Sequence, residues 1–312
     1  MMKIVLAIGG NSLIRDKKHQ SFKDQCETVK ETCKHIANLI EKGHDIVITH
    51  GNGPQVGFLL IRSEFTRKLI PPDPLDACGA SSQGLIGYII QRALKNEFKN
   101  RGIKKEVATV VTQVIVDEND PAFSNPTKPI GPFMTKEEAE ERARENGWIV
   151  KEDAGRGWRR VVPSPIPKKI IEIEAIKSLI KSGAVVIAVG GGGIPVIEKD
   201  NELIGVEAVI DKDLASSLLA IELNADLFLI STAVDEVYLD FGKLTQRAIR
   251  KMTPEEAEKY LKEGHFAEGS MAPKIRACIQ FVKKTENPAI ITSPQKLEEA
   301  IKGEAGTRIC YG

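Results

Sequence analysis

The stretch that decides the fold is Lys3-Ile-Val-Leu-Ala-Ile-Gly-Gly-Asn11, an apolar run that ends in glycine. Three further apolar runs also end in glycine or a small polar residue, and they lie in residues 45–53, 184–193 and 227–232. Continuous runs of Val, Ile and Leu are typical of strands buried on both faces of a parallel sheet, whose ligands bind beyond the carboxyl ends of the strands. Glycine there lets backbone N–H groups approach an anion. The pattern therefore predicts an α/β protein built around a polyphosphate.

The size and charge of the chain exclude several classes of protein. Its 312 residues are enough to bury a large core, in one α/β unit with lobes or in two domains. No apolar run approaches the roughly 20 residues that span a bilayer, and residues 1–10 lack the features of a signal peptide. We therefore expect no membrane association and a cytoplasmic location. With 44 basic and 43 acidic residues, the chain has no general attraction to nucleic acid, so anions must bind at local sites.

The cysteines and histidines show no metal-binding pattern. The five cysteines are scattered without a CxxC pair, which indicates reduced thiols rather than disulfides or zinc. No two histidines have the spacing of metal ligands. His50 follows a predicted strand directly before Gly51, where it could contact an anion or transfer protons, and we favour a positioning role.

Helical periodicity separates the predicted strands. Apolar residues recur at three- and four-residue spacing in residues 21–42, so a helix and the strand at 45–50 complete a β-α-β unit. A second predicted helix, residues 82–97, is apolar nearly all round and must be buried in the core or against another subunit. Residues 107–116 are rich in β-branched side chains and predict one further strand.

The character of the chain changes after residue 116. Residues 117–165 are rich in Pro, Asn, Gly and charge, which favours a small subdomain projecting from the sheet. A helix over residues 168–182 is then expected to return the chain to the strand at 184–189. Further helices are predicted at 213–223, 253–263 and 274–285.

Two familiar phosphate-binding signatures are absent from the sequence, namely GxxxxGK[ST] and GxGxxG. Other segments are candidates instead. Asp211-Lys212-Asp213 precedes a predicted helix, and Ser270 is a plausible N-cap for a helix that contains Lys274. Helix N-termini favour anions, and a lysine adds a full charge. Asp213 could alternatively serve only as the N-cap of its helix.

Lys128 lies between two prolines, which restrict the backbone around this charge. Such restriction favours a functional lysine over an idle surface charge, although the sequence leaves both open. Arg156, Arg159 and Arg160 surround Trp158 and either bind an acidic group or stabilise the local ribbon.

Taken in order, seven motifs resemble those of carbamate kinases, a branch of the amino acid kinase superfamily, over essentially the whole chain. The motifs are Ala7-Ile-Gly-Gly-Asn11, Thr49-His-Gly-Asn-Gly-Pro-Gln55, Asn125-Pro-Thr-Lys-Pro-Ile-Gly-Pro132, Gly155-Arg-Gly-Trp-Arg-Arg160, Gly190-Gly-Gly-Gly-Ile-Pro195, Val209-Ile-Asp-Lys-Asp213 and Gly269-Ser-Met-Ala-Pro-Lys274.

The resemblance implies a three-layer α/β/α fold with an open, mainly parallel sheet. It implies a carbamate-binding lobe over residues 1–212, including the subdomain at about 117–165, and a nucleotide-binding lobe over 213–312. The implied reaction is reversible phosphoryl transfer between ATP and carbamate, giving ADP and carbamoyl phosphate, with Mg²⁺ on the nucleotide. A homodimer is also implied.

The resemblance assigns site residues as well. Lys128, Lys212 and Lys274 would act on the transferred phosphoryl group, with Asp211 orienting the lysines. The remaining implied contacts are Gly9, Gly10 and Asn11 for phosphate; Gly51, Asn52 and Gly53 for carbamate; and Ser231, Thr232, Asp235, Ser270, Met271 and Lys274 for the nucleotide. Related kinases carry a lysine where Ala7 stands, so Lys128 would supply that charge from the subdomain. Carbamate is already an oxyanion, so no general base is needed.

Two alternatives remain at this point. Another kinase of the superfamily could act on a different small carboxylate or phosphate. A non-catalytic nucleotide sensor could keep the same fold, but the presence of all three lysines argues against it.

Overall fold

An eight-stranded sheet forms the centre of the protein in a computed structural model that describes residues 1–16, 18–153 and 155–312. The strand order is β15-β17-β16-β12-β1-β2-β9-β3, and every neighbouring pair is parallel except β16 and β17. The strands are β1 (Lys3–Ile8), β2 (Asp45–His50), β3 (Val107–Thr109), β9 (Val185–Ile187), β12 (Leu227–Ser231), β15 (Lys251–Met252), β16 (Ala289–Thr292) and β17 (Thr307–Ile309).

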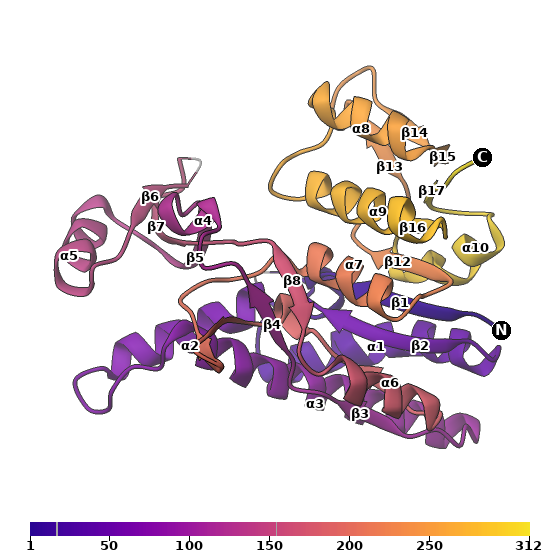
Figure 1. Ribbon diagram of the computed structural model, residues 1–312, viewed down its shortest axis with the longest axis horizontal. Helices are drawn as coiled ribbons and strands as arrows, with labels where there is room; N and C mark the ends of the chain where they lie inside the picture. Colours follow the sequence, from indigo (N-terminus) through magenta and orange to yellow (C-terminus); the bar gives the residue numbers. More distant parts are fainter. Residues whose placement is uncertain (17, 154) are drawn as a thin grey trace.

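Helices cover both faces of this sheet (Figure 1). Side chains alternate along β1, so Ile4 and Leu6 pack into one core, while Val5 and Ala7 pack into the other. The first core includes α1, α3 and α10, and the second includes α7 and α9. The helices are α1 (Phe22–Glu41), α2 (Gly53–Thr66), α3 (Leu75–Arg101), α6 (Ile173–Lys181), α7 (Lys212–Glu222), α8 (Pro254–Lys262), α9 (Met271–Thr285) and α10 (Leu297–Lys302). The predicted three-layer α/β/α fold is confirmed.

Three smaller sheets extend from the layers. One has the order β11-β10-β4-β8, another pairs β13 with β14, and the third has the order β5-β7-β6. Their strands are β4 (Gln113–Val116), β5 (Lys128–Met134), β6 (Val150–Glu152), β7 (Trp158–Val162), β8 (Pro167–Ile170), β10 (Ile194–Lys199), β11 (Glu202–Gly205), β13 (Val237–Leu239) and β14 (Arg247–Ile249).

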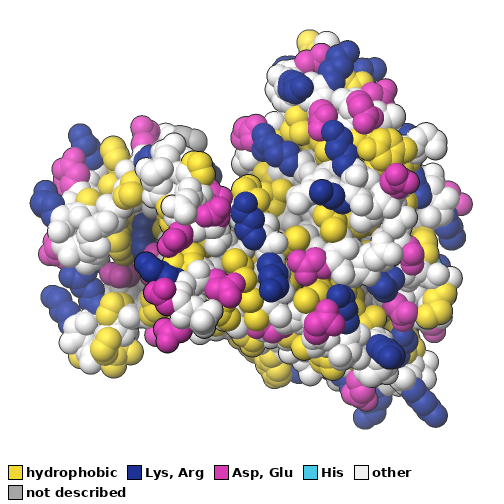
Figure 2. Space-filling model, in the orientation of Figure 1, with side chains coloured by type: hydrophobic (Ala, Val, Ile, Leu, Met, Phe, Trp, Pro, Cys, Tyr) yellow, Lys and Arg dark blue, Asp and Glu magenta, His cyan; other side chains and the backbone are white. Residues whose placement is uncertain are grey.

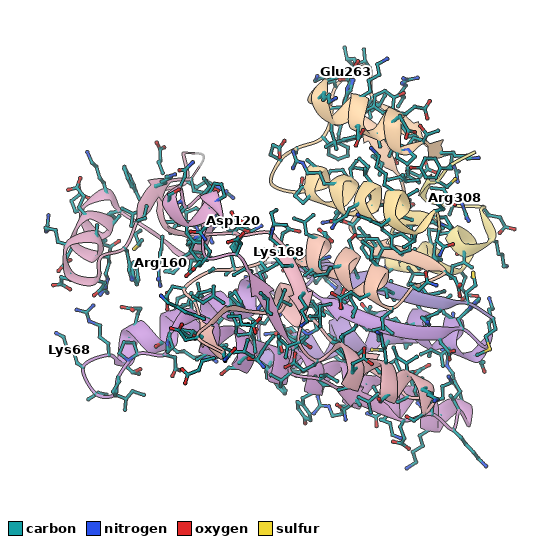
Figure 3. The ribbon with its side chains drawn as sticks, viewed as in Figure 1. Lys68, Asp120, Arg160, Lys168, Glu263 and Arg308 are labelled. Carbon is teal, nitrogen blue, oxygen red and sulfur yellow. The ribbon has the colours of Figure 1, made fainter. Side chains whose placement is uncertain are left out.

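The third sheet, with α4 (Pro121–Ser124) and α5 (Lys136–Asn146), forms a projecting subdomain, residues 121–162. Figure 2 shows a deep notch between this subdomain and the part of the molecule that carries α8 and α9. Ion pairs link the subdomain to the main body, because Arg160 lies 2.5 Å from Glu207 and Arg67 lies 2.8 Å from Glu145. Arg160 and the nearby tip at Lys68 are labelled in Figure 3.

The strand predicted over residues 107–116 is wrong as a single element. It breaks at 110–112, where β3 ends in the central sheet and β4 begins in the four-stranded sheet. Thr112 occupies the break, because its hydroxyl donates to the carbonyl of Val110 at 2.7 Å and accepts from the N–H of Val189 at 3.0 Å. Side-chain hydrogen bonds of this kind compete with a strand ladder.

Other predicted boundaries also shift. The helix expected over 168–182 begins at Ile173, because residues 167–170 form β8, which pairs antiparallel with β4. The helix expected over 82–97 extends over Leu75–Arg101, and the strand expected over 184–189 is confined to Val185–Ile187. Helix α2 was not predicted, because Gly51-Asn-Gly-Pro54 looks like a loop; Pro54 instead lies in the first turn of the helix.

Among the described residues, no helix combines the length and apolar character needed to cross a membrane.

Candidate functional site

The candidate site is a cavity of about 400 Å³ that lies between the subdomain, the loops after β1 and β2, and the first turns of α7 and α9. This is where parallel α/β sheets bind ligands, beyond the carboxyl ends of the strands. Its lining includes Gly10, Gly51, Asn52, Gly53, Lys128, Arg159, Gly191, Asp211, Lys212, Asp213, Ser270 and Lys274.

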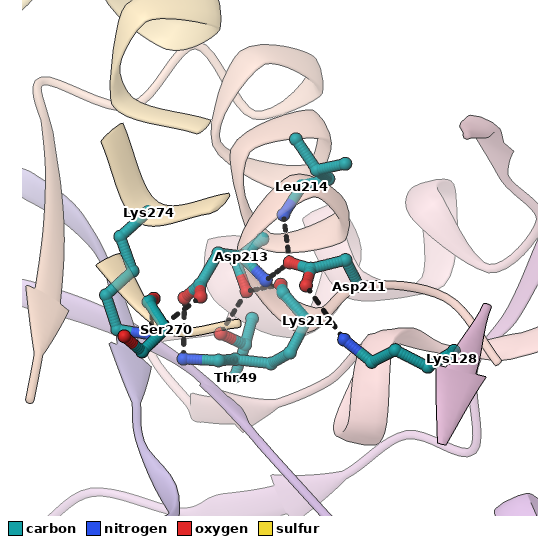
Figure 4. A network of polar contacts seen from close by, with 9 residues as sticks. Thr49, Lys128, Asp211, Lys212, Asp213, Leu214, Ser270 and Lys274 are labelled. Atoms are coloured by element: carbon teal, nitrogen blue, oxygen red, sulfur yellow. Dashed lines mark hydrogen bonds and ion pairs between the residues drawn. The ribbon is translucent and has the colours of Figure 1, made fainter. Parts of the chain in front are cut away.

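Three lysines meet two carboxylates along this cavity (Figure 4). The Nζ atom of Lys128, at the start of β5, lies 3.4 Å from Oδ2 of Asp211. The Nζ atoms of Lys212 and Lys274 lie 2.7 Å and 2.9 Å from the two carboxylate oxygens of Asp213. Three positive charges thus face two negative ones, which leaves a net attraction for an anion.

The structure separates the two aspartates, because Asp211 caps α7 and pairs with Lys128, whereas Asp213 pairs with the other two lysines. Asp211 is the N-cap of α7, where it accepts hydrogen bonds from the N–H groups of Asp213 at 2.9 Å and Leu214 at 3.3 Å. Asp213, which could have been the cap, instead contacts Lys212 and Lys274. Only Lys128 is paired with Asp211 among the described residues. The sequence could have indicated Asp211 as the cap, because an N-cap side chain accepts from the N–H groups two and three residues later, here those of Asp213 and Leu214.

Burial and charge act against each other at this pair of lysines. Asp213 is 4% exposed, and burial alone would raise the pKa of its carboxyl group. The charges of Lys212 and Lys274 outweigh burial and lower this pKa below its usual value. Burial lowers the pKa of the Lys212 ammonium, while Asp213 partly offsets that effect. The Lys212 ammonium is buried 2.7 Å from Asp213 and makes no well-aligned hydrogen bond to another described residue.

The first glycine loop contributes less than predicted. The N–H of Gly9 donates to the carbonyl of Ser231 at 3.0 Å, so it is already occupied. Gly10 lines the cavity, whereas the side chain of Asn11 lies outside the described residues. Among the described residues, this loop reaches the cavity through Gly10.

The second loop lies fully on the cavity, because Gly51, Asn52 and Gly53 all line it. Gly191, from the 190–193 run, faces Asn52 across a short distance. A Cβ atom at Gly191 would lie 2.2 Å from Nδ2 of Asn52, and its φ of +68° favours glycine. The 190–193 run therefore serves close packing at least as much as anion contact.

The predicted nucleotide residues do not gather in one cavity. Ser270 and Lys274 line the site, but Thr232 lines a second cavity of about 320 Å³ beside α1. Ser231 is buried, and Asp235 is exposed. Met271, the first residue of α9, packs partly buried against the core that includes α7 and α9.

Predicted polar residues around the site have structural partners. His50 is buried, its Nδ1 lies 2.9 Å from the carbonyl of Gly51, and burial lowers its pKa to about 4. A neutral His50 therefore holds the loop, in agreement with a positioning role. Arg156 and Arg159 both pair with Asp153, which stabilises the ribbon, and Arg159 also lines the cavity.

Metal ligands are not gathered in the described residues, where no group of three or more His, Cys, Asp or Glu side chains has a suitable arrangement. Both aspartates of the cavity are already engaged by lysines.

Comparison with known proteins identifies the family. Residues 2–293 match the amino acid kinase family. The chain belongs to this family. It is 52% identical to a carbamate kinase from Pyrococcus horikoshii over 309 residues, which are 98% of each chain. It is also 52% identical to a carbamate kinase from Clostridium perfringens over 312 residues, which are 99% of each.

A solved structure agrees with these relatives. Carbamate kinase from Giardia lamblia bound to AMP-PNP superimposes with a TM-score of 0.94 at 42% identity, covering 99% of this chain and 98% of the other. This member of the amino acid kinase family is therefore a kinase, a phosphotransferase, as predicted.

Proposed function

We propose that the protein transfers a phosphoryl group reversibly between ATP and carbamate, giving ADP and carbamoyl phosphate. The observation that carries the proposal is the convergence of Lys128, Lys212 and Lys274 on one cavity. The curated relatives at 52% identity are carbamate kinases, which favours carbamate among the small acceptors of the family.

The site suits an acceptor that needs no deprotonation. Asp211 and Asp213 are engaged by lysines, and His50 is buried, neutral and bonded to the Gly51 carbonyl. The charges of two lysines outweigh burial and lower the pKa of Asp213, Asp211 pairs with Lys128, and burial lowers the pKa of His50 to about 4, so all three are weak bases. In the forward step a carbamate oxygen forms a bond to the γ-phosphorus, and the bond from that phosphorus to the β–γ bridging oxygen breaks. No proton moves, so catalysis reduces to positioning and charge neutralisation.

Each lysine has a place in this scheme. Lys212 and Lys274 extend from the first turns of α7 and α9, where the helix N-termini add to their attraction for phosphate. Lys128 approaches from the subdomain and supplies the charge that related kinases carry at the position of Ala7. Mg²⁺, bound to the nucleotide as part of the substrate, would shield the charge of the phosphates.

The proposal is tested by ATP formation from carbamoyl phosphate and ADP in a coupled assay. Turnover of acetylglutamate, glutamate and uridine monophosphate is measured in parallel. Faster turnover of any of these three would reassign the acceptor. Equilibrium binding of ADP without any turnover would favour the nucleotide sensor instead.

We also propose that the protein is cytoplasmic and that its two lobes comprise residues 1–212 and 213–312. We further propose that it forms a homodimer through an exposed face of α3. The α3 helix buries Ile86 and Ile90 in the core, yet Tyr88 is 50% exposed beside Val111, which is 53% exposed. Strand β3 lies at the edge of the central sheet next to this face. Light scattering after gel filtration checks the dimer, and Tyr88→Lys is expected to shift it toward monomer.

A further inference from the structure

Helix α3 lies behind the loops that line the candidate site, on the side away from the cavity. Ser82 and Gln83 are 0% and 1% exposed, and neither lines the cavity. Both nevertheless form hydrogen bonds to the loops that do. Burying a polar side chain lowers the stability of the fold unless the side chain forms hydrogen bonds. The hydrogen-bond partners of Ser82 and Gln83 therefore show which loops these side chains fix.

Ser82 holds Asn52 directly. The Nδ2 atom of Asn52 donates to the Ser82 hydroxyl at 2.7 Å, and this hydroxyl donates in turn to the carbonyl of Gly79 at 2.7 Å. The single hydroxyl proton is therefore committed to the helix, and its oxygen faces Asn52. This bond fixes the orientation of the Asn52 amide at the wall of the cavity.

Gln83 holds the backbone of Gly190 and Gly191, which lies against the other side of Asn52. We call the space between Ser82 and this backbone, which Asn52 occupies, the slot. Its Nε2 donates to the carbonyls of Gly190 at 2.9 Å and Thr112 at 3.1 Å, and its Oε1 accepts from the N–H of Thr112 at 2.8 Å. Both amide protons and the amide oxygen are thus used. Gln83 connects two loops that are far apart in the sequence.

The loop held by Gln83 carries a strained residue. Val189 has a φ of +53° although it is β-branched, a conformation that needs support from its surroundings. The Thr112 hydroxyl provides support, because it accepts from the N–H of Val189 at 3.0 Å. The next residues, Gly190 and Gly191, pack directly against His50 and Asn52.

We propose that Ser82 and Gln83 are positioning residues for the carbamoyl end of the substrate, acting through Asn52 and the Gly190–Gly191 backbone. The inference rests on the proposed function, in which the 51–53 loop binds carbamate. Helix α3 then sets the width of the slot that holds Asn52. None of these hydrogen bonds reaches α7 or α9, whose first turns carry Lys212 and Lys274.

The test replaces Ser82 with alanine, which removes the hydroxyl and leaves little empty volume. In the carbamoyl phosphate and ADP assay, Ser82→Ala is expected to raise KM for carbamoyl phosphate about tenfold, the effect of one lost hydrogen bond. KM for ADP stays within about twofold of wild type. Ser81→Ala is the matched control, because Ser81 is the adjacent serine on the same helix and is exposed. A purely structural role would lower the melting temperature and activity without this split between the two KM values, and that result would overturn the proposal.

A second measurement needs no substrate and separates this proposal from the assigned reaction. Urea unfolding midpoints are compared for Ser82→Ala, Asn52→Ala and the double variant. We expect the double variant to be about as stable as Asn52→Ala alone, because the shared bond is lost only once. Additive losses would contradict the coupling even if carbamoyl phosphate is turned over. Failure of wild type to make ATP, with the coupling intact, would instead reject the proposed reaction and its carbamoyl end.

Discussion

Asp213 is the residue on which the charges of the site depend. It lies between Lys212 and Lys274, and its lowered pKa keeps it ionised at neutral pH. Asp213→Asn keeps the shape but leaves two ammonium groups to repel each other, so the two lysines lose their fixed positions and we expect kcat to fall by about 10²-fold. Steady-state kinetics measures this loss. The control Glu174→Gln breaks an exposed ion pair with Lys177, at 2.8 Å, and should leave kcat unchanged. A similar loss of kcat in this control would refute the role assigned to Asp213.

His50 predicts a pH dependence of stability. Its pKa is lowered from 6.5 to about 4 by burial, so the unfolded chain takes up a proton at higher pH than the folded chain. The stability contributed by neutral His50 is complete above pH 6.5 and is lost as the pH falls toward 4, by about 3 kcal/mol in total. Urea unfolding at pH 7 and pH 4.5 measures the loss. His50→Asn is expected to show a smaller loss over this range, and an equal loss would show that His50 does not titrate in this way.

At the level of elements, the sequence predicts well what is buried on both faces. Strands β1, β2 and β12 were predicted within one residue, because unbroken apolar runs have few other uses. Contacts between distant segments could not be predicted. Thr112 looks like any strand residue until Val189 is placed beside it, and Ser82 looks like part of an apolar helix until Asn52 is. Lys128, Lys212 and Lys274 were assigned to one site only because their motifs resemble those of a known family.

A comparison of Gly191 with Gly43 distinguishes two costs of replacing glycine, namely backbone strain and steric contact. Gly191 and Gly43 both have positive φ, but a Cβ atom meets Asn52 at 2.2 Å from Gly191 and nothing within 4 Å from Gly43. We expect Gly43→Ala to lower the unfolding free energy by about 1 kcal/mol with normal kinetics. Gly191→Ala should in addition raise KM for carbamoyl phosphate at least about tenfold, since Asn52 must move. Equal kinetics in the two variants would mean that the slot tolerates the added methyl group.

In the whole molecule, the subdomain has to bring Lys128 to a cavity built mainly by other elements. Lys128→Ala removes the charge itself, so kcat should fall by about 10²–10³. Glu207→Gln keeps the Lys128 side chain but weakens the link to Arg160 that helps to position it, while the amide oxygen of the new side chain can still accept from the N–H of Leu75. One partly exposed ion pair is worth at most about 1 kcal/mol, so we expect a loss of about two- to fivefold in kcat.

The position of the link should matter as much as its strength. Glu145→Gln breaks the ion pair between Arg67 and the C-terminal part of α5, in the outer part of the subdomain. If the subdomain turns as a rigid unit, both variants should lower kcat. If only its base positions Lys128, Glu145→Gln should be silent while Glu207→Gln is not. We expect the second result, because Lys128 pairs with Val162 and Ile130 with Arg160 in the same short ladder, which joins the lysine directly to the Arg160–Glu207 contact. Normal kinetics in Glu207→Gln would show instead that β5 holds Lys128 without this link.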